Sequence, residues 1–385
     1  MTLSILQVLP IDIAHVSGVR RHILELSENL KKLGNDVTMV ALCSNSAINV
    51  SNQKSMRQII YSAPKCQGII KDSVFWLHAG QALKRLSDWD IVHIHGAQAS
   101  ILKMNLKKPM IATNHGLEPI FTRYSRTLPQ FLLYRLVGLT AYNIFPEKTI
   151  AVTTKVRKEL KDFYKVPEAK IKLIPDGVDT ENFRPLPQNE LVDFQQKINL
   201  DEDRVLLFVG NTTRLKNLHG LLLALARVVK ENSDVKLLVV GDRAQGENGR
   251  AINKIIEKHG LRKHVVFTGF LDGNDLVCAY NCSEALVLPS FYEGCGLAYL
   301  EAMSCGLPVI GSTEVADEIV LEGLTGFRVN PFYYECLADR IMLLLQDSKL
   351  RKEMGKKART YAVNNFSWKI ITNRILETYD EVLGQ

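Results

Sequence analysis

The chain has 385 residues, of which 46% are hydrophobic and 23% are charged, enough for two domains of roughly 150 to 200 residues each. No apolar run approaches the ~20 residues of a membrane-spanning helix. Residues 1–10 lack the basic start of a signal peptide and are predicted to form a first strand. We therefore expect a cytoplasmic protein and neither a membrane-spanning nor a secreted one.

The positive charge is unevenly distributed along the chain. Residues 1–185 contain 25 Lys and Arg against 15 Asp and Glu, whereas residues 186–385 contain 23 against 26. A basic first half fits contact with anionic lipid, an acidic acceptor or nucleic acid, and it equally fits a solvated surface rich in lysine. No nucleic-acid recognition motif is present, so nucleic acid is not expected as a partner.

The cysteines and histidines do not predict a metal site. The seven cysteines stand singly at positions 43, 66, 278, 282, 295, 305 and 336. They form no CxxC pair, and we expect them to be small buried residues in a reducing compartment. His93 and His95 have the two-residue spacing of metal ligands, but no third ligand follows at a fitting distance.

Strands and helices alternate along the first half of the chain. A helical pattern over residues 22–33 places Ile23, Leu26 and Leu30 on one face, and Gly34 ends it. Strand-like runs are found at 5–9, 37–42, 91–95, 110–113, 149–152 and 172–174. This alternation predicts a parallel sheet covered by helices on both faces.

A second series of the same kind follows. Its predicted strands are 205–209, 236–240, 265–268, 285–288 and 309–311, and its predicted helices are 218–229, 251–258 and 297–304. Two prolines within residues 183–188 stiffen the connection between the series. The sequence thus predicts an α/β protein with two Rossmann-like, doubly wound domains, 1–184 and 185–366, facing an interdomain cleft where ligands bind beyond the strand ends.

Residues 288–310 are the most informative segment. A strand ends before a loop that contains Gly294 and Gly296, and a helix is predicted to begin near Leu297 and to stop at Gly306. The backbone N–H groups of Gly294, Gly296 and Leu297 would point out of the helix start. Such a helix start is a ready site for a diphosphate.

Two carboxylates occupy different places in this segment. Glu293 lies on the loop, and Glu301 lies about one turn into the helix. Because a carboxylate can accept two hydrogen bonds at once, Glu301 suits the two hydroxyls of a ribose and Glu293 suits hydroxyls of a transferred sugar. Either glutamate alone also fits a charge stabilised by the helix dipole, whereas the pair in this context is far more specific.

The spacing of Glu293 and Glu301 resembles the Glu-x7-Glu signature of the retaining glycosyltransferases of family 4, a glycogen-synthase-like and mannosyltransferase-like group with the GT-B fold. The resemblance covers nearly the whole chain, because further segments match in order and spacing: 17–26, 90–95, 174–185 and 209–217. It implies transfer of a hexosyl unit from a UDP- or GDP-sugar to a glycan, lipid-linked or small-molecule acceptor. It also implies no metal, no cofactor, and a C-terminal helix, 367–385, that packs back on the first domain.

The resemblance also implies roles for single residues. Gly18 would let the first loop approach the donor phosphates, because it has no side chain. Arg214 and Lys216 would neutralise the leaving diphosphate, which is essential in a site without metal. His115 would face the transferred sugar and the acceptor.

Contacts with the donor base are expected around Phe270 and Leu271. Lys216 stands near a predicted helix start, where a cation is unfavourable, and this favours a ligand for it.

Four positions depart from the family pattern. Ser17 replaces one glycine of a pair, Asn211 replaces a basic residue after the strand glycine, Cys295 replaces an aromatic residue, and Asp176 replaces an asparagine. Asn211 is retained as a donor-binding candidate, and Arg214 is expected to supply the missing positive charge.

For the mechanism, the resemblance implies attack on the face that the nucleotide leaves, with the departing phosphate taking the acceptor proton. No carboxylate pair at glycosidase separation is then needed. The protein would contribute positioning, charge stabilisation and exclusion of water.

Other classes of protein fit less well. A metal-dependent glycosyltransferase requires Asp-x-Asp after a strand, but residues 88–90 precede their strand and residues 201–203 lie in a polar connection. A dinucleotide oxidoreductase requires GxGxxG after the first strand, where the chain has only Ser17 and Gly18. A nucleotide-sugar epimerase and a non-catalytic sugar-nucleotide-binding protein on the same architecture remain as alternatives.

The acceptor is expected on the first domain. Its basic charge and the apolar, basic stretch 121–137 lead to a hypothesis about the acceptor. It would be a lipid-linked or acidic glycan, used by a chain attached peripherally to the inner face of a membrane.

Overall fold

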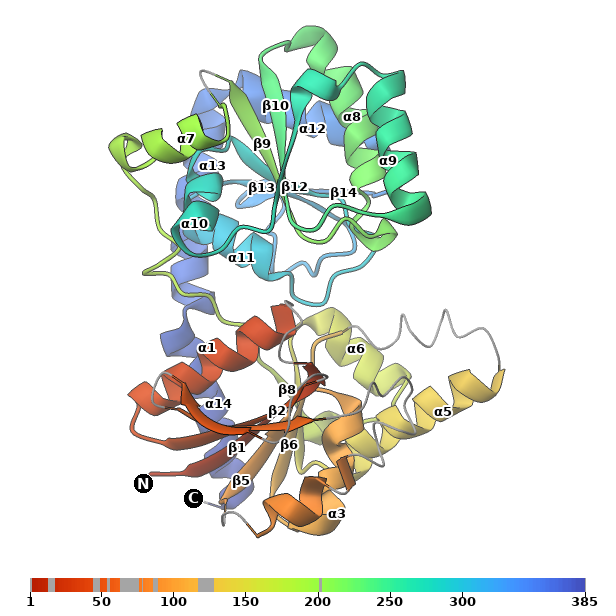
Figure 1. The fold of residues 1–385 in the computed structure, drawn as a ribbon, viewed down its shortest axis with the longest axis vertical. Coiled ribbons are helices and arrows are strands. Elements are labelled where there is room, and N and C mark those ends of the chain that lie inside the picture. Colours follow the sequence, from red (N-terminus) through yellow and green to blue (C-terminus); the bar gives the residue numbers. More distant parts are fainter. Residues whose placement is uncertain are drawn as a thin grey trace. The chain divides into compact units, whose positions relative to one another are not determined.

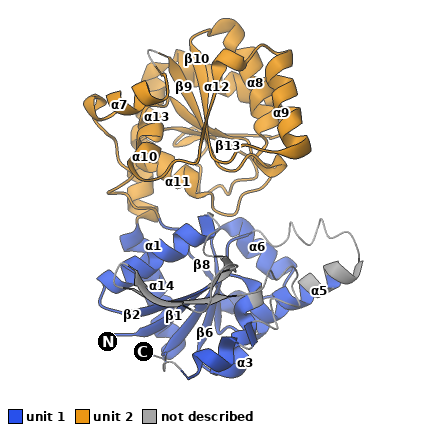
Figure 2. Ribbon diagram, in the orientation of Figure 1, with its two compact units in different colours: residues 1–177, 368–385 blue, residues 178–367 orange. Residues whose placement is uncertain are grey.

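The structure, a computed structural model, describes residues 2–12, 18–43, 49–53, 56–62, 76–77, 79–85, 89–116, 128–200 and 203–384. The chain divides into two compact units (Figure 2). Unit 1 consists of Met1–Gly177 and Trp368–Gln385, and unit 2 consists of Val178–Ser367. Each unit is a sheet with helices packed on it (Figure 1).

The sheet of unit 1 has eight strands among the described residues, in the order β3-β4-β2-β1-β5-β6-β7-β8. All neighbouring pairs are parallel except β3 with β4, which is antiparallel at one edge. The strands are β1 (Ser4–Asp12), β2 (Asp36–Cys43), β3 (Asn49–Gln53), β4 (Met56–Ser62), β5 (Ile91–Ile94), β6 (Met110–Asn114), β7 (Lys148–Ala151) and β8 (Ile171–Leu173).

The C-terminal helix of the chain belongs to the core of unit 1. The main helices of this unit are α1 (Gly18–Lys32), α3 (Lys103–Leu106), α5 (Leu128–Leu139), α6 (Thr154–Asp162) and α14 (Trp368–Leu383). Trp368, Ile371 and Ile375 of α14 pack with Ile23 and Leu26 of α1 in one buried cluster. The predicted C-terminal helix is therefore confirmed, and it packs on the first unit as expected.

The sheet of unit 2 has six strands, all parallel, in the order β11-β10-β9-β12-β13-β14. The strands are β9 (Arg204–Val209), β10 (Val235–Val240), β11 (Val265–Gly269), β12 (Ala285–Leu288), β13 (Val309–Ser312) and β14 (Gly326–Val329). The helices are α7 (Val192–Lys197), α8 (Leu218–Glu231), α9 (Gly246–Lys258), α10 (Gly273–Asn281), α11 (Leu297–Ser304), α12 (Tyr334–Gln346) and α13 (Ser348–Phe366).

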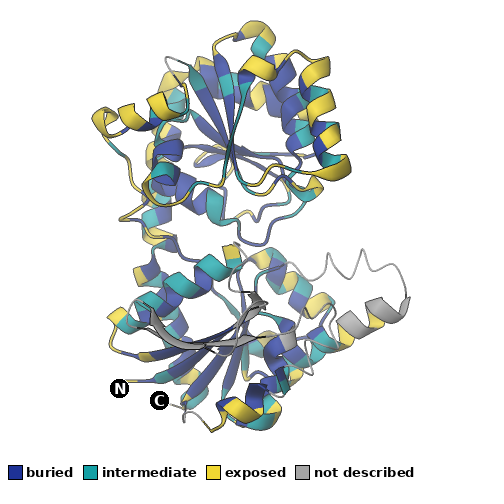
Figure 3. Ribbon diagram, in the orientation of Figure 1, coloured by how far each residue is buried: buried dark blue, intermediate teal, exposed yellow. Residues whose placement is uncertain are grey.

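Burial follows the layers of each unit (Figure 3). The central strands of both sheets are buried on both faces, as expected for parallel strands covered by helices. The helices bury one side, as in α8, where Leu221, Leu225 and Val228 face the core. The predicted α/β architecture with two doubly wound sheets is confirmed.

Two expectations on cysteines and membrane helices can be compared with the structure. Cys278, Cys295 and Cys305 are buried as predicted, but Cys336 is exposed, because it lies in the first turn of α12. No helix in the described part of the chain is long and apolar enough to cross a bilayer.

Candidate functional site

The strand order of unit 2 reverses between β9 and β12, which lie side by side. Ligands of open parallel sheets bind beyond the carboxyl ends of the strands at such a reversal. Lys216 follows β9 and Glu293 follows β12. The topology therefore brings together two residues that are 77 positions apart in the sequence.

Lys216 and Glu293 form an ion pair at this point. The Lys216 Nζ lies 2.7 Å from Oε1 and 2.9 Å from Oε2 of Glu293. The hydroxyl of Ser290 donates to the same Oε1 at 2.7 Å. Glu293 is 5% exposed, while the side chain of Lys216 is 25% exposed. One end of the pair is thus buried, and the cation reaches solvent.

Asn217 holds the loops around this pair together. Its backbone is in the left-handed region, with φ 53°, and its side-chain oxygen accepts from the N–H of Gly220 in the first turn of α8. Its Nδ2 donates to the carbonyls of Pro289 and Pro331. Sequence reasoning did not single out Asn217, although Asn is the residue that best tolerates this conformation and caps a helix as well.

The start of α11 requires glycine at position 296. Gly296 has φ +81°, and a Cβ placed on it would lie 2.6 Å from the ring of Tyr299. The hydroxyl of Tyr299 in turn donates to the carbonyl of Leu288 at the end of β12. The predicted helix limits are confirmed, since α11 begins at Leu297 and ends before Gly306. This close packing fixes the backbone at the start of α11, and with it the direction of the N–H groups there.

Glu301 lies on α11 and is 4% exposed. Its Oε2 accepts a hydrogen bond of 2.6 Å from the hydroxyl of Tyr280 on α10. Tyr280 was not among the predicted residues. The contact fixes the orientation of the carboxylate.

The other predicted donor-binding residues lie near the strand ends without joining the ion pair. Arg214 is exposed, and its Nη2 lies 3.6 Å from Oε1 of Glu247. Asn211 is exposed and accepts from the Thr213 hydroxyl. Phe270 is 55% exposed, and Leu271 beside it is half-buried, directly after β11.

In unit 1, His115 follows β6 and belongs to a buried set of histidines. His115 Nε2 lies 3.2 Å from His95 Nδ1, and His95 Nε2 lies 2.8 Å from the side-chain oxygen of Gln7. Gln7 also donates to the hydroxyl of Tyr379 on α14. His93 has both of its ring nitrogens engaged, with Tyr379 and with Thr113.

A buried carboxylate lies on the other side of His115. Asp176 Oδ1 is 3.4 Å from His115 Nδ1 and 2.9 Å from His22 Nδ1. Burial alone would raise the pKa of Asp176, but His22 and His115 outweigh it and hold that pKa well below its usual range. Burial lowers the pKa of His115, and the contact with Asp176 offsets part of this effect. At neutral pH the carboxylate is therefore ionised and the His115 ring is neutral.

The fold brings two further histidines close to His95, although no third ligand follows it at a fitting distance in the sequence. Ligand atoms of His22, His95 and His115 lie within 4.8 Å of one another. Sequence spacing could not indicate this cluster, because its members come from α1, from the end of β5 and from the end of β6. Only the order of strands in the sheet brings them together.

Gly18 is exposed and is the first residue of α1. The preceding loop residues 13–17, with Ser17, lie outside the described residues. Of the Asp-x-Asp segments, Asp88 and Asp201 also lie outside them. Asp90 accepts from the backbone N–H of Ser4, and Asp203 pairs with Lys236. Both of these aspartates therefore have a partner within the fold.

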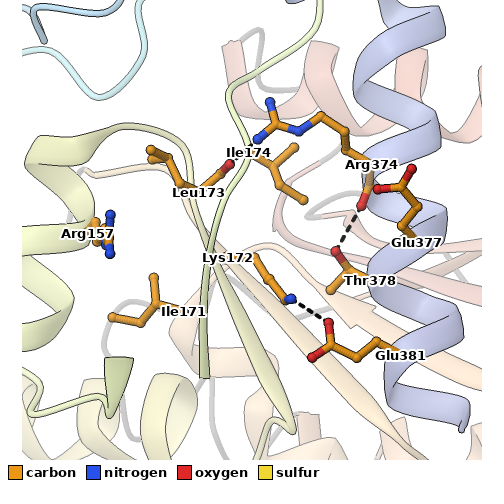
Figure 4. Close-up of a pocket in the computed structure, with 9 residues that line it drawn as sticks. All are labelled: Arg157, Ile171, Lys172, Leu173, Ile174, Arg374, Glu377, Thr378 and Glu381. Carbon is orange, nitrogen blue, oxygen red and sulfur yellow. Dashed lines mark hydrogen bonds and ion pairs between the residues drawn. The ribbon is translucent and has the colours of Figure 1, made fainter. Parts of the chain in front are cut away.

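A polar pocket of about 440 Å³ lies in unit 1 between β8, α6 and α14 (Figure 4). Three of the charged groups that line it have partners. Lys172 Nζ lies 2.5 Å from Glu381, Arg374 donates to the carbonyl of Leu173, and Arg157 pairs with Glu168. Because none of the predicted site residues lines it, we do not assign the site to this pocket.

Comparison with known proteins covers both units. The family profile described as Glycosyltransferase Family 4 matches residues 16–182, and the profile described as Glycosyl transferases group 1 matches residues 191–361. An uncharacterized glycosyltransferase of Methanocaldococcus jannaschii is 25% identical, over 96% of each chain.

Two solved structures share the fold. Sucrose-phosphate synthase from Thermosynechococcus elongatus has a TM-score of 0.84 at 22% identity, over 99% of each chain. HepE of Anabaena, solved in complex with UDP-glucose, has a TM-score of 0.81 at 18% identity, covering 98% of this chain and all of that one.

Proposed function

The chain belongs to the group 1 and family 4 glycosyltransferases with the GT-B fold, and on this premise we propose that it transfers a hexosyl unit from a nucleotide diphosphate sugar. The proposed transfer retains the anomeric configuration and requires no metal ion. The observation that carries the proposal is the pair of Lys216 and Glu293 at the strand reversal of unit 2.

The donor diphosphate would bind at the start of α11. The N–H groups at Gly296 and Leu297 offer donors, and the positive end of the helix dipole favours an anion. The cation of Lys216 lies 2.7 Å from Glu293 and remains partly exposed, so it can share its charge with a phosphate. Solved HepE structures contain UDP and UDP-glucose, which supports a UDP-sugar as the first donor to test.

The chemistry follows from charge. As the bond between sugar and phosphate breaks, negative charge grows on the terminal phosphate, and Lys216 and Arg214 would stabilise it in place of a metal. Glu293 would hold Lys216 in position and accept hydrogen bonds from hydroxyls of the sugar. Glu301, oriented by Tyr280, would accept from the ribose.

His115 would contact a hydroxyl of the transferred sugar or of the acceptor. A neutral imidazole suits this role, because it forms hydrogen bonds without placing a positive charge beside an oxocarbenium-like transition state. The buried carboxylate of Asp176 would fix the ring by its contact with Nδ1.

The acceptor would be a lipid-linked or acidic glycan at an anionic membrane surface. Leu132 and Leu136 on α5 are 53% and 57% exposed and lie one helical turn apart. Arg135 lies between them, and Lys158 on α6 is also exposed. Exposed leucines with basic neighbours favour binding to an anionic interface. The part of the apolar stretch at residues 121–127 lies outside the described residues.

Donor binding is tested by thermal shift with UDP, GDP, ADP, dTDP and their common sugar conjugates, in EDTA and in magnesium. A ligand at 100 times its dissociation constant adds about 2.7 kcal/mol, which raises the midpoint of domains of this size by several degrees. We expect one nucleotide family to shift the wild type in EDTA and Glu301→Ala to lose the shift. If none of the nucleotides or sugar conjugates shifted the midpoint, the proposal would be contradicted, and a protein that binds another ligand would be favoured.

Membrane binding is tested separately by flotation with neutral vesicles and with vesicles that contain anionic lipid. We expect flotation only with anionic vesicles, and its loss in Leu132→Ser/Leu136→Ser. Leu33→Ser/Leu324→Ser is a matched control, because these leucines are also exposed but lie elsewhere. Equal flotation of both double variants would refute this surface as the contact.

A further inference from the structure

Three imidazole rings meet at the strand reversal of unit 1, where β1 and β5 are neighbours. His22 comes from α1, His95 follows β5, and His115 follows β6. One ligand atom of each lies within 4.8 Å of the others. His22 and His95 are each 3% exposed, and the side chain of His115 is 8% exposed. The cluster is therefore shielded from water, which competes for metal ions.

Each ring has an oxygen close to one of its nitrogens, but neither His22 Nδ1 nor Asp176 Oδ1 has a hydrogen-bond partner among the described residues. Asp176 Oδ1 lies 2.9 Å from Nδ1 of His22 and 3.4 Å from Nδ1 of His115. Gln7 Oε1 accepts from Nε2 of His95 at 2.8 Å. A carboxylate or an amide oxygen behind the ring is the usual arrangement for metal-ligating histidines, because it sets the tautomer and aims the other nitrogen at the metal.

The remaining nitrogens are His22 Nε2, His95 Nδ1 and His115 Nε2. The last two are 3.2 Å apart, close to the ~3.4 Å between two nitrogens bound to one tetrahedral zinc ion. His22 Nε2 is buried and has no hydrogen-bond partner in the described part of the chain. A buried ring nitrogen without a partner is costly unless a ligand occupies the space before it.

We propose that His22, His95 and His115 bind one divalent transition-metal ion, such as zinc, with Asp176 and Gln7 orienting the rings from behind. Three imidazole ligands favour such ions over magnesium or calcium. The fourth position of a tetrahedral site stays open to water or to a ligand. Binding requires the most distant pair of ligand atoms to move from at most 4.8 Å to ~3.4 Å, a movement of about half an ångström to one ångström per ring.

His93 provides an internal comparison. It lies two residues before His95 on β5 and is equally buried. Both of its nitrogens already have partners, Tyr379 and Thr113 at 2.7 Å each. His93 is therefore not a ligand, and a change at His93 disturbs the same strand without removing a metal contact.

The site shares His115 with the reaction proposed above, which itself needs no metal. One consequence does rest on that proposed function: a metal ion on Nε2 of His115 withdraws this nitrogen from the sugar, so that metal binding inhibits transfer and a chelator restores it. Metal binding itself stands whether or not His115 contacts a sugar.

Binding is tested on the full-length protein, stripped with EDTA and titrated with Co²⁺ and then with Zn²⁺ in competition with a chromophoric chelator. The visible spectrum of bound Co²⁺ reports its geometry and the number of nitrogen ligands. The variants are His22→Gln and His95→Gln, with His93→Gln as the matched control and thermal midpoints recorded for all of them. His259→Gln, which changes an exposed histidine, serves as a second control should His93→Gln fail to fold.

We expect one equivalent of Co²⁺ with an intense tetrahedral or five-coordinate spectrum, displaced by Zn²⁺. Affinity should fall at least about tenfold in His22→Gln and His95→Gln, as for the loss of ligands or of their supporting groups, and stay within about twofold in the folded control. Absence of a stoichiometric Co²⁺ spectrum would overturn the proposal. So would equal affinity in His95→Gln and the control, because His95 would then not be a ligand.

Discussion

The pair of Lys216 and Glu293 makes a prediction in which stability and activity separate. Replacing Lys216 by Met removes the cation beside the Glu293 carboxylate, which is 5% exposed, and leaves it the hydrogen bond from the Ser290 hydroxyl. Breaking a buried ion pair on one side costs about 3–5 kcal/mol. Because the Lys216 side chain is 25% exposed, solvent screens part of this, and we expect about 2–3 kcal/mol.

The opposite change costs less. Glu293→Gln removes the charge but keeps an oxygen that can accept from Ser290, and it leaves a cation that reaches solvent. We expect about 1 kcal/mol for this variant. In the double variant Lys216→Met/Glu293→Gln no buried charge is left, so stability should return to within about 1 kcal/mol of the wild type.

The assay is a double-mutant cycle on two observables. Urea unfolding of the three variants and the wild type gives the coupling energy, which we expect to be about 2 kcal/mol. Calorimetric titration with the nucleotide found in the donor screen gives the second observable. The proposed role of Lys216 at the diphosphate predicts that binding falls by about tenfold or more in both variants that lack Lys216.

The double variant decides the question. If its stability returns while nucleotide binding stays weak, the pair is both an ion pair of the fold and part of the donor site. Recovery of nucleotide binding together with stability would show that Lys216 acts only through the fold. A coupling energy near zero would refute the energetic reasoning itself.

Three further predictions concern single positions. Gly296→Ala should lower the free energy of unfolding by about 2–4 kcal/mol, because it combines a positive φ with a Cβ 2.6 Å from Tyr299. Gly306→Ala is also at positive φ, but its nearest contact is at 3.5 Å, so it should lower that free energy by about 1–2 kcal/mol. Equal losses measured by urea unfolding would contradict this. Asn217→Ala should cost at least about 2 kcal/mol more than Asn199→Ala, since both have φ near +50° but only Asn217 joins two loops and a helix start through its side chain. Burial lowers the pKa of His93 well below 6.5, so this ring stays neutral in the folded protein while it takes up a proton in the unfolded chain. Lowering the pH from 7.5 to 5.5 in EDTA should therefore lower the free energy of unfolding by about 1.4 kcal/mol through this residue alone. His93→Gln should lose that part of the pH dependence.

Local sequence patterns predicted most of unit 2. The runs 205–209 and 285–288 are apolar and short, and they became β9 and β12, which are buried as central parallel strands. The loop at residues 288–310 was predicted together with its helix limits, because glycines mark both ends of α11.

One edge strand of each sheet was not predicted, whereas the opposite edge strands, β8 and β11, were. Strand β3 (Asn49–Gln53) is mostly polar and has no apolar alternation, and it pairs only with β4. Strand β14 (Gly326–Val329) is four residues long and lies at the other unit's sheet edge. An edge strand has one neighbour and less burial, so its sequence carries a weaker signal.

Contacts between distant residues were missed for another reason. His22 and Asp176 are 154 positions apart in the numbering, and neither carries a local signal of the 2.9 Å contact that joins them. The contact depends on the parallel sheet, in which α1 follows β1 and residue 176 follows β8, so that both lie where the strands end. The Asn-to-Asp departure at position 176 was visible in the sequence, but its two histidine partners were not.

The central claim is retaining, metal-independent transfer from a nucleotide sugar, and the most direct test follows the donor by proton NMR. The donor identified in the binding screen, with its sugar in α linkage, would be incubated with the enzyme in EDTA, first with water as the only acceptor. Retaining transfer predicts slow release of the nucleoside diphosphate with the α-anomer of the free hexose formed first, and loss of this release in Lys216→Met. First formation of the β-anomer, or release that requires added magnesium, would contradict it.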